Sequence, residues 1–252
     1  SSSPSASSLA GSPSATGSDA PASSFAGSSG GVTGWTLVLG CARAVAGQDP
    51  SRRRPTEVDV EGHGREEELA ADIDLSRTVG WFTTKYPVAL NVGGLDWAQV
   101  RAGDAKLGAL IKAAKEQLRA HPDGLSYGAL RYLNDAVDLE GPDPTIGFNY
   151  LGRMAAAATQ TSGDYWEICP DGSSAGTAAA IPMPLMHTLE LNAGTVDTDD
   201  GPRLRGGWTW ALSALDHVQV NRLSELWFDA LTGICTHVRD GGGGLTPSDI
   251  TP

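Results

Sequence analysis

The sequence predicts an α/β fold, because strand-like and helix-like segments alternate along the chain. Runs rich in β-branched and aromatic residues form the first kind of segment. Runs whose apolar residues recur every three or four positions form the second. Hydrophobic residues make up 40% of the 252 residues, which is enough for a substantial core. A chain of this length holds one large domain or two small ones.

The first segment, residues 1–31, consists mainly of Ser, Ala, Gly and Pro. Its large apolar residues Leu9 and Phe25 are isolated, so the segment cannot bury enough surface to offset the entropy lost on ordering. We predict a disordered linker here. Between residues 32 and 46 the apolar residues follow a helical period, which predicts a largely buried helix that stops at Gly47.

A strand is predicted at residues 57–60, and it runs into Gly62 and Gly64. Glycine accepts backbone angles that other residues avoid, so we expect the strand to stop here in a tight turn. Glu61 and His63 would then project from a strand end into open space, a common position for chemistry. An ordinary turn with an exposed Glu and His is the alternative interpretation.

The next predicted strand covers residues 79–90, where Pro87 indicates an edge or a bend. Arg77 precedes this strand and is expected to pair with a carboxylate and brace it, since a guanidinium fork suits that role. Residues 107–118 carry one apolar stripe with charged residues on the other faces, which predicts an amphipathic surface helix. A shorter helix is expected at residues 126–133.

Residues 145–152 are predicted to form a strand that ends at a glycine. Strand alternation would place Phe148 and Tyr150 on one face of this strand and Asn149 on the other.

The last third of the chain predicts a β-hairpin followed by a long helix. Segments 187–193 and 204–210 are strand-like and are separated by turn residues. Residues 218–238 follow the helical period most clearly of all. The glycine run that begins at Gly241 ends this helix, and residues 241–252 are expected to form a flexible exit linker.

Composition excludes several classes of function. The net charge of −12 argues against a nucleic-acid or anionic-membrane partner, and no apolar run reaches membrane-spanning length. The cysteines Cys41, Cys169 and Cys235 are far apart, which suggests neither a disulfide framework nor a zinc site and fits a reducing cytoplasm. Phosphate-binding loops and metal-ligand spacings are missing, so we expect no metal and no cofactor of the chain's own.

Several motifs follow one another along the chain. They are Val58-Asp59-Val60-Glu61-Gly62-His63-Gly64-Arg65-Glu66, Asp74-Leu75-Ser76-Arg77-Thr78-Val79-Gly80-Trp81-Phe82-Thr83-Thr84, Tyr86-Pro87-Val88, Ser126-Tyr127-Gly128, Leu130-Arg131-Tyr132-Leu133 and Gly147-Phe148-Asn149-Tyr150-Leu151-Gly152. In this order they resemble the second half of a condensation-type domain of nonribosomal peptide synthetases, and the resemblance covers residues 32–249. The form Glu-Gly-His-Gly-Arg-Glu resembles the epimerisation subtype in particular.

This resemblance implies a chloramphenicol-acetyltransferase-like lobe, with a mixed sheet flanked by helices, over residues 32–240. It implies epimerisation of the α-carbon of a thioester carried on the phosphopantetheine arm of a peptidyl carrier protein. Glu61 matches the family's acid/base glutamate, and Tyr150 matches a tyrosine near the site. Asn149 is a weaker candidate. His63 lines the site or holds the turn.

Arg65 and Arg77 are expected to have structural roles. The family's second acid/base group lies in an N-terminal lobe, in a His-His-x-x-x-Asp-Gly motif that these 252 residues do not contain. We therefore expect this chain to be inactive without that lobe. Two alternatives stay open, namely an amide-forming condensation lobe and a non-catalytic lobe that docks carrier proteins or neighbouring modules.

Overall fold

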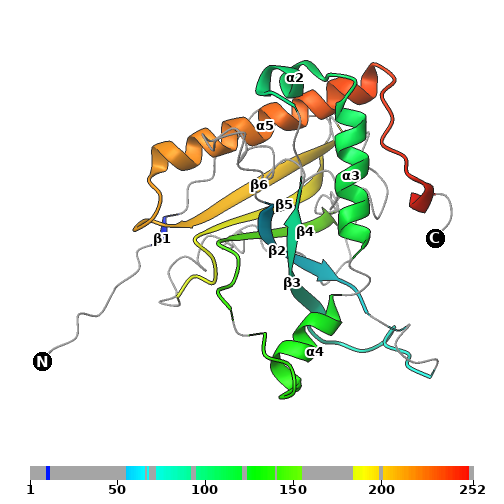
Figure 1. Cartoon of the computed structure of the whole chain (residues 1–252), viewed down its shortest axis with the longest axis vertical. Helices are drawn as coiled ribbons and strands as arrows, with labels where there is room; N and C mark the ends of the chain where they lie inside the picture. The colour runs from blue at the N-terminus through cyan, green and yellow to red at the C-terminus, as the bar shows by residue number, and fades with distance from the viewer. Residues whose placement is uncertain are drawn as a thin grey trace, which may run out of the picture.

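The computed structural model describes residues 10–11, 55–65, 67, 72–91, 95–120, 124–139, 141–154, 184–198 and 201–249 (Figure 1). The helix predicted at residues 32–46 and most of the linker predicted at residues 1–31 lie outside these ranges.

One mixed sheet forms the centre of the molecule. Its strand order is β1-β6-β5-β4-β2-β3. The pairs β2–β4 and β4–β5 are parallel, whereas β1–β6, β5–β6 and β2–β3 are antiparallel. The predicted α/β class with a mixed sheet is confirmed. The strands are β1 (Ala10–Gly11), β2 (Thr56–His63), β3 (Thr83–Leu90), β4 (Ile146–Met154), β5 (Leu189–Thr198) and β6 (Gly201–Ala211).

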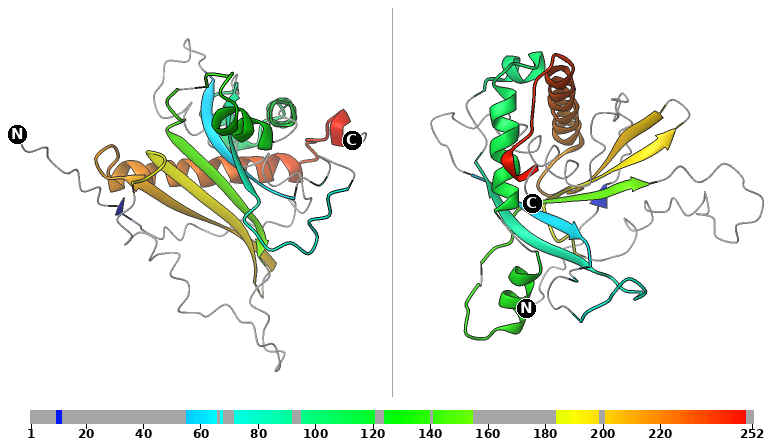
Figure 2. Two further views of the ribbon diagram at one scale, coloured as in Figure 1. Left: turned by 90° about the horizontal axis from the view of Figure 1, so that it is seen from below. Right: turned by 90° about the vertical axis from the view of Figure 1, so that its right-hand side faces the viewer.

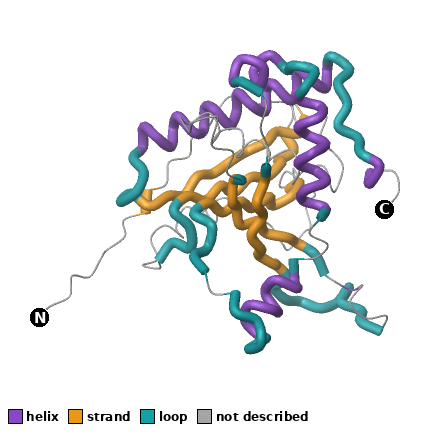
Figure 3. Tube along the Cα trace, in the orientation of Figure 1, coloured by secondary structure: helices purple, strands orange, loops and turns teal. Residues whose placement is uncertain are grey.

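Helices flank the sheet, as Figures 2 and 3 show. The longest, α5, runs along one face of the sheet, and α3 stands beside β3 (Figure 1). The helices predicted at residues 107–118, 126–133 and 218–238 are confirmed within one or two residues. The helices are α2 (Trp97–Ala102), α3 (Leu107–Arg119), α4 (Leu125–Leu133) and α5 (His217–Arg239), with a short 3₁₀ helix, η4 (Pro247–Asp249). No described helix is both long and apolar enough to cross a membrane.

The hydrophobic core lies between the sheet and α5. Strand alternation turns Val58 and Val60 of β2 and Phe148 of β4 into this core. Trp227 of α5 is fully buried against them and meets Trp208 of β6 edge to face, with ring centroids 6.1 Å apart. Because these strand residues fill the helix-covered face, the residues between them point to the opposite face.

Strand β2 continues through Gly62, contrary to the predicted turn there, and ends at His63, just before Gly64. His63 pairs with Thr83 of β3. Pairing with a neighbouring strand therefore overrides the turn tendency of the glycine, and Glu61 lies within the strand instead of at its end. The prediction that Pro87 marks an edge is confirmed, because β3 is the last strand of the sheet.

Strand β4 likewise continues past its glycine. Gly152 has a φ of 79°, and the register with β5 shifts between Tyr150 and Arg153. A left-handed residue inside a strand marks a bulge, so the glycine bends β4 here but does not end it.

The segment after α5 packs on the lobe as far as Asp249, although the sequence predicts a flexible linker at residues 241–252. The Asp249 carboxylate accepts hydrogen bonds from Lys115 and Arg119 of α3, at 2.5 Å each. It also accepts one from the backbone N–H of Thr246, at 2.7 Å. The sequence pattern does not show this anchor because its partners lie about 130 residues earlier in the chain.

Candidate functional site

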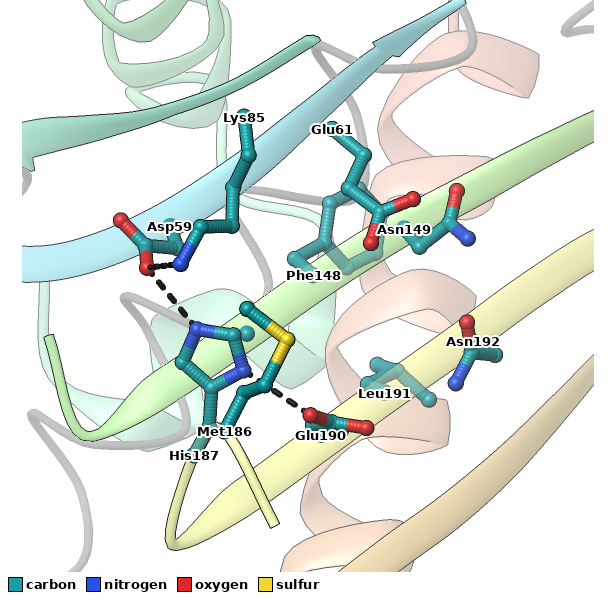
Figure 4. Close-up of a pocket in the computed structure, with 11 residues that line it drawn as sticks. Asp59, Glu61, Lys85, Phe148, Asn149, Met186, His187, Glu190, Leu191 and Asn192 are labelled. Atoms are coloured by element: carbon teal, nitrogen blue, oxygen red, sulfur yellow. Dashed lines mark hydrogen bonds and ion pairs between the residues drawn. The ribbon is translucent and has the colours of Figure 1, made fainter. Parts of the chain in front are cut away.

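A shallow pocket lies on the face of the sheet opposite α5 (Figure 4). Alternation along β2, β4 and β5 directs polar side chains to this face while their neighbours fill the core. Lys85 of β3 reaches it from the edge strand, and His187 from the segment before β5. The polar side chains that line the pocket are Asp59, Glu61, Lys85, Asn149, His187, Glu190 and Asn192.

Four of these side chains form one charged network. The Asp59 carboxylate, of which only 2% is exposed, accepts hydrogen bonds from Lys85 Nζ at 2.9 Å and from His187 Nε2 at 2.8 Å. The other ring nitrogen of His187, Nδ1, lies 2.9 Å from Oε1 of Glu190. The network thus joins β2, β3 and β5 across the pocket floor.

The pKa shifts of His187, Lys85 and Asp59 all favour the charged form of the side chain. Hydrogen bonds to Asp59 and to Glu190 raise the pKa of His187 to about 9. Both ring nitrogens face carboxylate oxygens, which only accept, so the doubly protonated imidazolium fits the site best. Burial alone would raise the pKa of Asp59, but hydrogen bonds from His187 and Lys85 outweigh it and hold that pKa below its usual value.

Gly147 leaves room for the ring of His187, because it has no side chain. A Cβ atom at Gly147 would lie 2.5 Å from Nδ1 of His187, closer than any side chain could approach. The ring therefore lies directly over the backbone of β4, between its two carboxylate partners.

Glu61 lies beside this network but outside it. Among the described residues, its carboxylate has no hydrogen-bond or ion-pair partner, and it is only partly exposed. Burial raises the pKa of Glu61 above its usual value, and the nearby Glu190 carboxylate adds to this, whereas the electrostatic interaction with His63 opposes it. A carboxyl group with a raised pKa and an open position suits proton transfer.

His63 orients the side chain of Asn149. Nε2 of His63 lies 2.6 Å from Oδ1 of Asn149, and Nδ1 lies 3.1 Å from the Thr83 hydroxyl oxygen. When Nε2–H donates to Oδ1, the NH₂ group of Asn149 is left to donate into the pocket. Figure 4 shows Asn149 beside Glu61, so the strand brings a carboxylate and an amide donor together.

Tyr150 lies on the other face of the sheet, as strand alternation predicts for a neighbour of Asn149. Its ring packs against the core, and its hydroxyl lies 3.0 Å from the hydroxyl of Thr195. The structure therefore groups Glu61, His63 and Asn149, and it does not bring Tyr150 to them.

Arg65 and Arg77 differ in their contacts. Arg65 donates to the carbonyl oxygen of Thr78 at 2.9 Å and lies over the ring of Phe82, 4.8 Å from its centroid, so it braces the segment before β3. Arg77 is exposed and forms no ion pair with any described residue. The expected partner of Arg77 is therefore not among the carboxylates that the structure describes, whereas Arg65 braces this segment through a carbonyl and a ring.

Sequence reasoning missed the charged network. No motif marks His187 in the sequence, because no other histidine is near it. The sequence does contain a signal for Asp59. It stands two residues before Glu61 on one predicted strand, so both side chains are expected on the same face. The three-residue spacing of His187 and Glu190 is another signal, although it has little weight without the strand order.

Metal ligation has no support in the part of the chain that the structure describes. No group of three or more His, Cys, Asp or Glu side chains there is placed to hold an ion. The carboxylates of Asp59 and Glu190 are already engaged by cationic side chains.

Comparisons with known proteins agree with this architecture. No protein-family model matches the chain. The solved epimerization domain from the third module of tyrocidine synthetase B superposes on 82% of this chain and 42% of that chain, with a TM-score of 0.58 and 24% identity. The fold is thus that of a condensation-type domain, and it matches less than half of one.

Curated relatives are much longer proteins. A linear gramicidin synthase of Brevibacillus parabrevis is 35% identical over 209 residues, which cover 80% of this chain and 4% of that protein. Bacitracin synthase 3 of Bacillus licheniformis is 37% identical over 158 residues, 62% of this chain and 2% of that protein. The chain therefore spans a few per cent of the length of these relatives. It belongs with the condensation-type domains of nonribosomal peptide synthetases and corresponds to the C-terminal lobe of such a domain.

Proposed function

We propose that this lobe takes part in epimerising the α-carbon of an aminoacyl or peptidyl thioester held on the phosphopantetheine arm of a peptidyl carrier protein. The observation that carries the proposal is Glu61, a carboxyl group with a raised pKa, no ion-pair partner among the described residues, and an amide donor beside it. The likeness of the fold to an epimerization domain supports the same assignment.

In this proposal Glu61 acts as one acid/base group. Its carboxylate takes the α-proton, the C–H bond breaks, and the electron pair moves into the thioester to give an enolate. The NH₂ group of Asn149, oriented by His63, donates to the negatively charged oxygen. A proton then returns to the α-carbon from the opposite face, which reverses the configuration and restores the thioester.

The second acid/base group is proposed to come from an N-terminal lobe, since these 252 residues contain no His-His-x-x-x-Asp-Gly motif. Apolar side chains that a partner lobe could cover are exposed on the described surface. Val79 and Trp81 are 100% and 89% exposed, and Leu133 of α4 is 85% exposed. Exposed apolar surface of this kind is typical of a surface that another domain contacts.

The test measures deuterium incorporation at the α-carbon of an aminoacyl thioester on a carrier protein in D₂O. We expect no exchange with the chain alone, and exchange when the chain is fused behind an N-terminal lobe of the same family. Glu61→Gln in the fusion should slow exchange by about a hundredfold or more, the usual contribution of a general acid or base. Tyr150→Phe should leave the rate close to that of the unsubstituted fusion, because its hydroxyl faces Thr195.

Three results would contradict the proposal. Exchange that persists in Glu61→Gln would exclude this residue as the acid/base group. Amide formation with an acceptor thioester, without α-exchange, would support the alternative of a condensation lobe. Binding of the carrier protein with neither reaction would support a docking lobe.

A further inference from the structure

The pairing of β2 with β3 sets Lys85 directly opposite Glu61, yet the two side chains do not pair. Glu61 and Lys85 are Cα partners in the ladder. Oppositely charged residues at such positions normally attract each other. The Lys85 ammonium instead donates diagonally to Asp59, two residues earlier on β2, at 2.9 Å. It also lies 3.9 Å from the Asp143 carboxylate.

The difference in burial explains why Lys85 pairs with Asp59 and not with Glu61. Asp59 is 2% exposed, and a charged carboxylate at that depth is stable only when cations and hydrogen bonds surround it. Glu61 is partly exposed, so water can solvate it. His187 donates to the same oxygen of Asp59 and is itself fixed by Glu190, which holds the Asp59 carboxylate in position for Lys85.

We propose that Asp59 is a positioning residue that, with His187, holds the ammonium group of Lys85 away from the Glu61 carboxyl. The carboxylates of Asp59 and Glu190 are matched by the cations Lys85 and His187. Asp143, which also lies near Lys85, is itself paired with Arg131. Glu61 is therefore left free to gain and lose a proton. The catalytic purpose of this arrangement rests on the function proposed above. The arrangement of the side chains does not depend on that function.

The charged groups that face Glu61 come from three of the surrounding elements. Asp59 and His63 lie on the same strand, Lys85 on β3, and Glu190 on β5 with His187 just before it. Strand β4 contributes no charged side chain to the pocket, and its polar residue there is the neutral Asn149. Lys85 and His187 are thus the cations of the network, and the direction of the Lys85 side chain decides whether Glu61 behaves as an ion-paired carboxylate or as a free acid.

The experiment is a pH titration of Glu61 followed by NMR of the whole chain with ¹³C-labelled glutamate carboxyls. The Glu61 signal is assigned by its loss in Glu61→Gln. In Asp59→Asn we expect Lys85 to turn to its register partner, which should lower the Glu61 midpoint by about one pH unit or more. In the double variant Asp59→Asn/Lys85→Met the midpoint should return toward that of the unsubstituted chain, because no ammonium is left to pair.

Removal of the Asp59 charge could lower the Glu61 midpoint by itself, and the double variant separates the two causes. If the midpoint falls equally in the single and double variants, or does not fall in Asp59→Asn, the proposal is wrong. Lys85→Met alone gives a second test in case Asp59→Asn does not fold. We expect little change there, whereas a rise of about one unit would show that Lys85 already acts on Glu61. The titration needs no substrate, so its result is independent of whether the lobe epimerises anything.

Discussion

The imidazole of His187 is held at both of its nitrogens, one by Asp59 and one by Glu190. Its side chain is only 5% exposed, and that of Asp59 only 2%. A hydrogen bond between two such groups is weakly screened by solvent and salt. Removal of one partner leaves the other as a buried, partly unsatisfied charge, which is the costly case.

His187 should therefore make the stability of the lobe depend on pH. Its folded-state pKa of about 9 exceeds the unfolded value of about 6.5. The stabilising contribution is then fully present below about pH 6.5 and is lost as the pH rises toward 9. Urea unfolding between pH 6 and 9.5 should show this decline. In His187→Gln the decline should flatten, and the free energy of unfolding at pH 6 should fall by roughly 2–4 kcal/mol.

The isolated histidine His217 offers a matched control for that measurement. It begins α5, on the side of the sheet opposite the pocket, and contacts Trp210 edge to face at 5.1 Å between ring centroids. His217→Gln should keep the decline of stability between pH 6.5 and 9. If His187→Gln shows the same slope as the unsubstituted chain, the doubly bonded imidazolium is not present in solution.

At the scale of elements, α5 packs closely on the sheet because β6 has a glycine at the point of contact. Gly206 of β6 lies under the ring of Trp227, and a Cβ atom there would come within 2.8 Å of that ring. Trp227 is fully buried and cannot move aside without opening the core. The neighbouring Gly207 points away from α5, and a Cβ atom there would meet nothing closer than 3.9 Å.

These two adjacent glycines give a matched pair of substitutions. Gly206→Ala should lower the free energy of unfolding by about 1–3 kcal/mol, the usual cost of overpacking a core. Gly207→Ala should change it by less than about 0.5 kcal/mol or raise it slightly, because alanine restricts the unfolded chain more than glycine does. Urea denaturation of both variants measures the difference. Equal effects would mean that α5 does not pack on β6 as closely as the structure shows.

The elements themselves were largely predictable from the sequence, and their ends less so. The period of the apolar residues identified α3 and α5 within two residues, because one face of each is buried. Helix α2 was missed, since its six residues are too few for a period. The glycines at Gly62 and Gly152 misled the prediction because a strand that has partners on the sheet can absorb a glycine.

The site was predictable only where it is local in sequence. Glu61 and His63 stand out as a motif beside two glycines, and alternation correctly placed Asn149 opposite Tyr150. The charged network could not be found in this way, since Asp59 meets Lys85 across 26 residues and His187 across 128. Only the strand order, which joins β2, β4 and β5 through parallel pairs, brings these side chains together.

At the scale of the whole molecule, the two faces of the sheet have different roles. One face of the sheet carries the core and α5, and the other carries the pocket. Substitutions on the first face should act through stability, whereas those of Glu61 should act on chemistry and leave stability nearly unchanged. The described end of the chain belongs to neither face, because η4 is attached to the outer side of α3.

That attachment gives a prediction for the C-terminal segment. Hydrogen bonds from Arg119, Lys115 and the Thr246 backbone hold the pKa of Asp249 well below its usual value. The contribution of Asp249 to stability is then present above about pH 3.8 and is lost as the pH falls through the lower folded-state pKa.

In Asp249→Asn the amide of Thr246 should exchange with D₂O about tenfold faster at neutral pH, the effect of losing a hydrogen bond to a charged group. Asp240→Asn, at the exposed end of α5, should leave this exchange unchanged. If Asp249→Asn also leaves it unchanged, the segment is held by the packing of η4, and its direction of exit from the lobe does not depend on these charges.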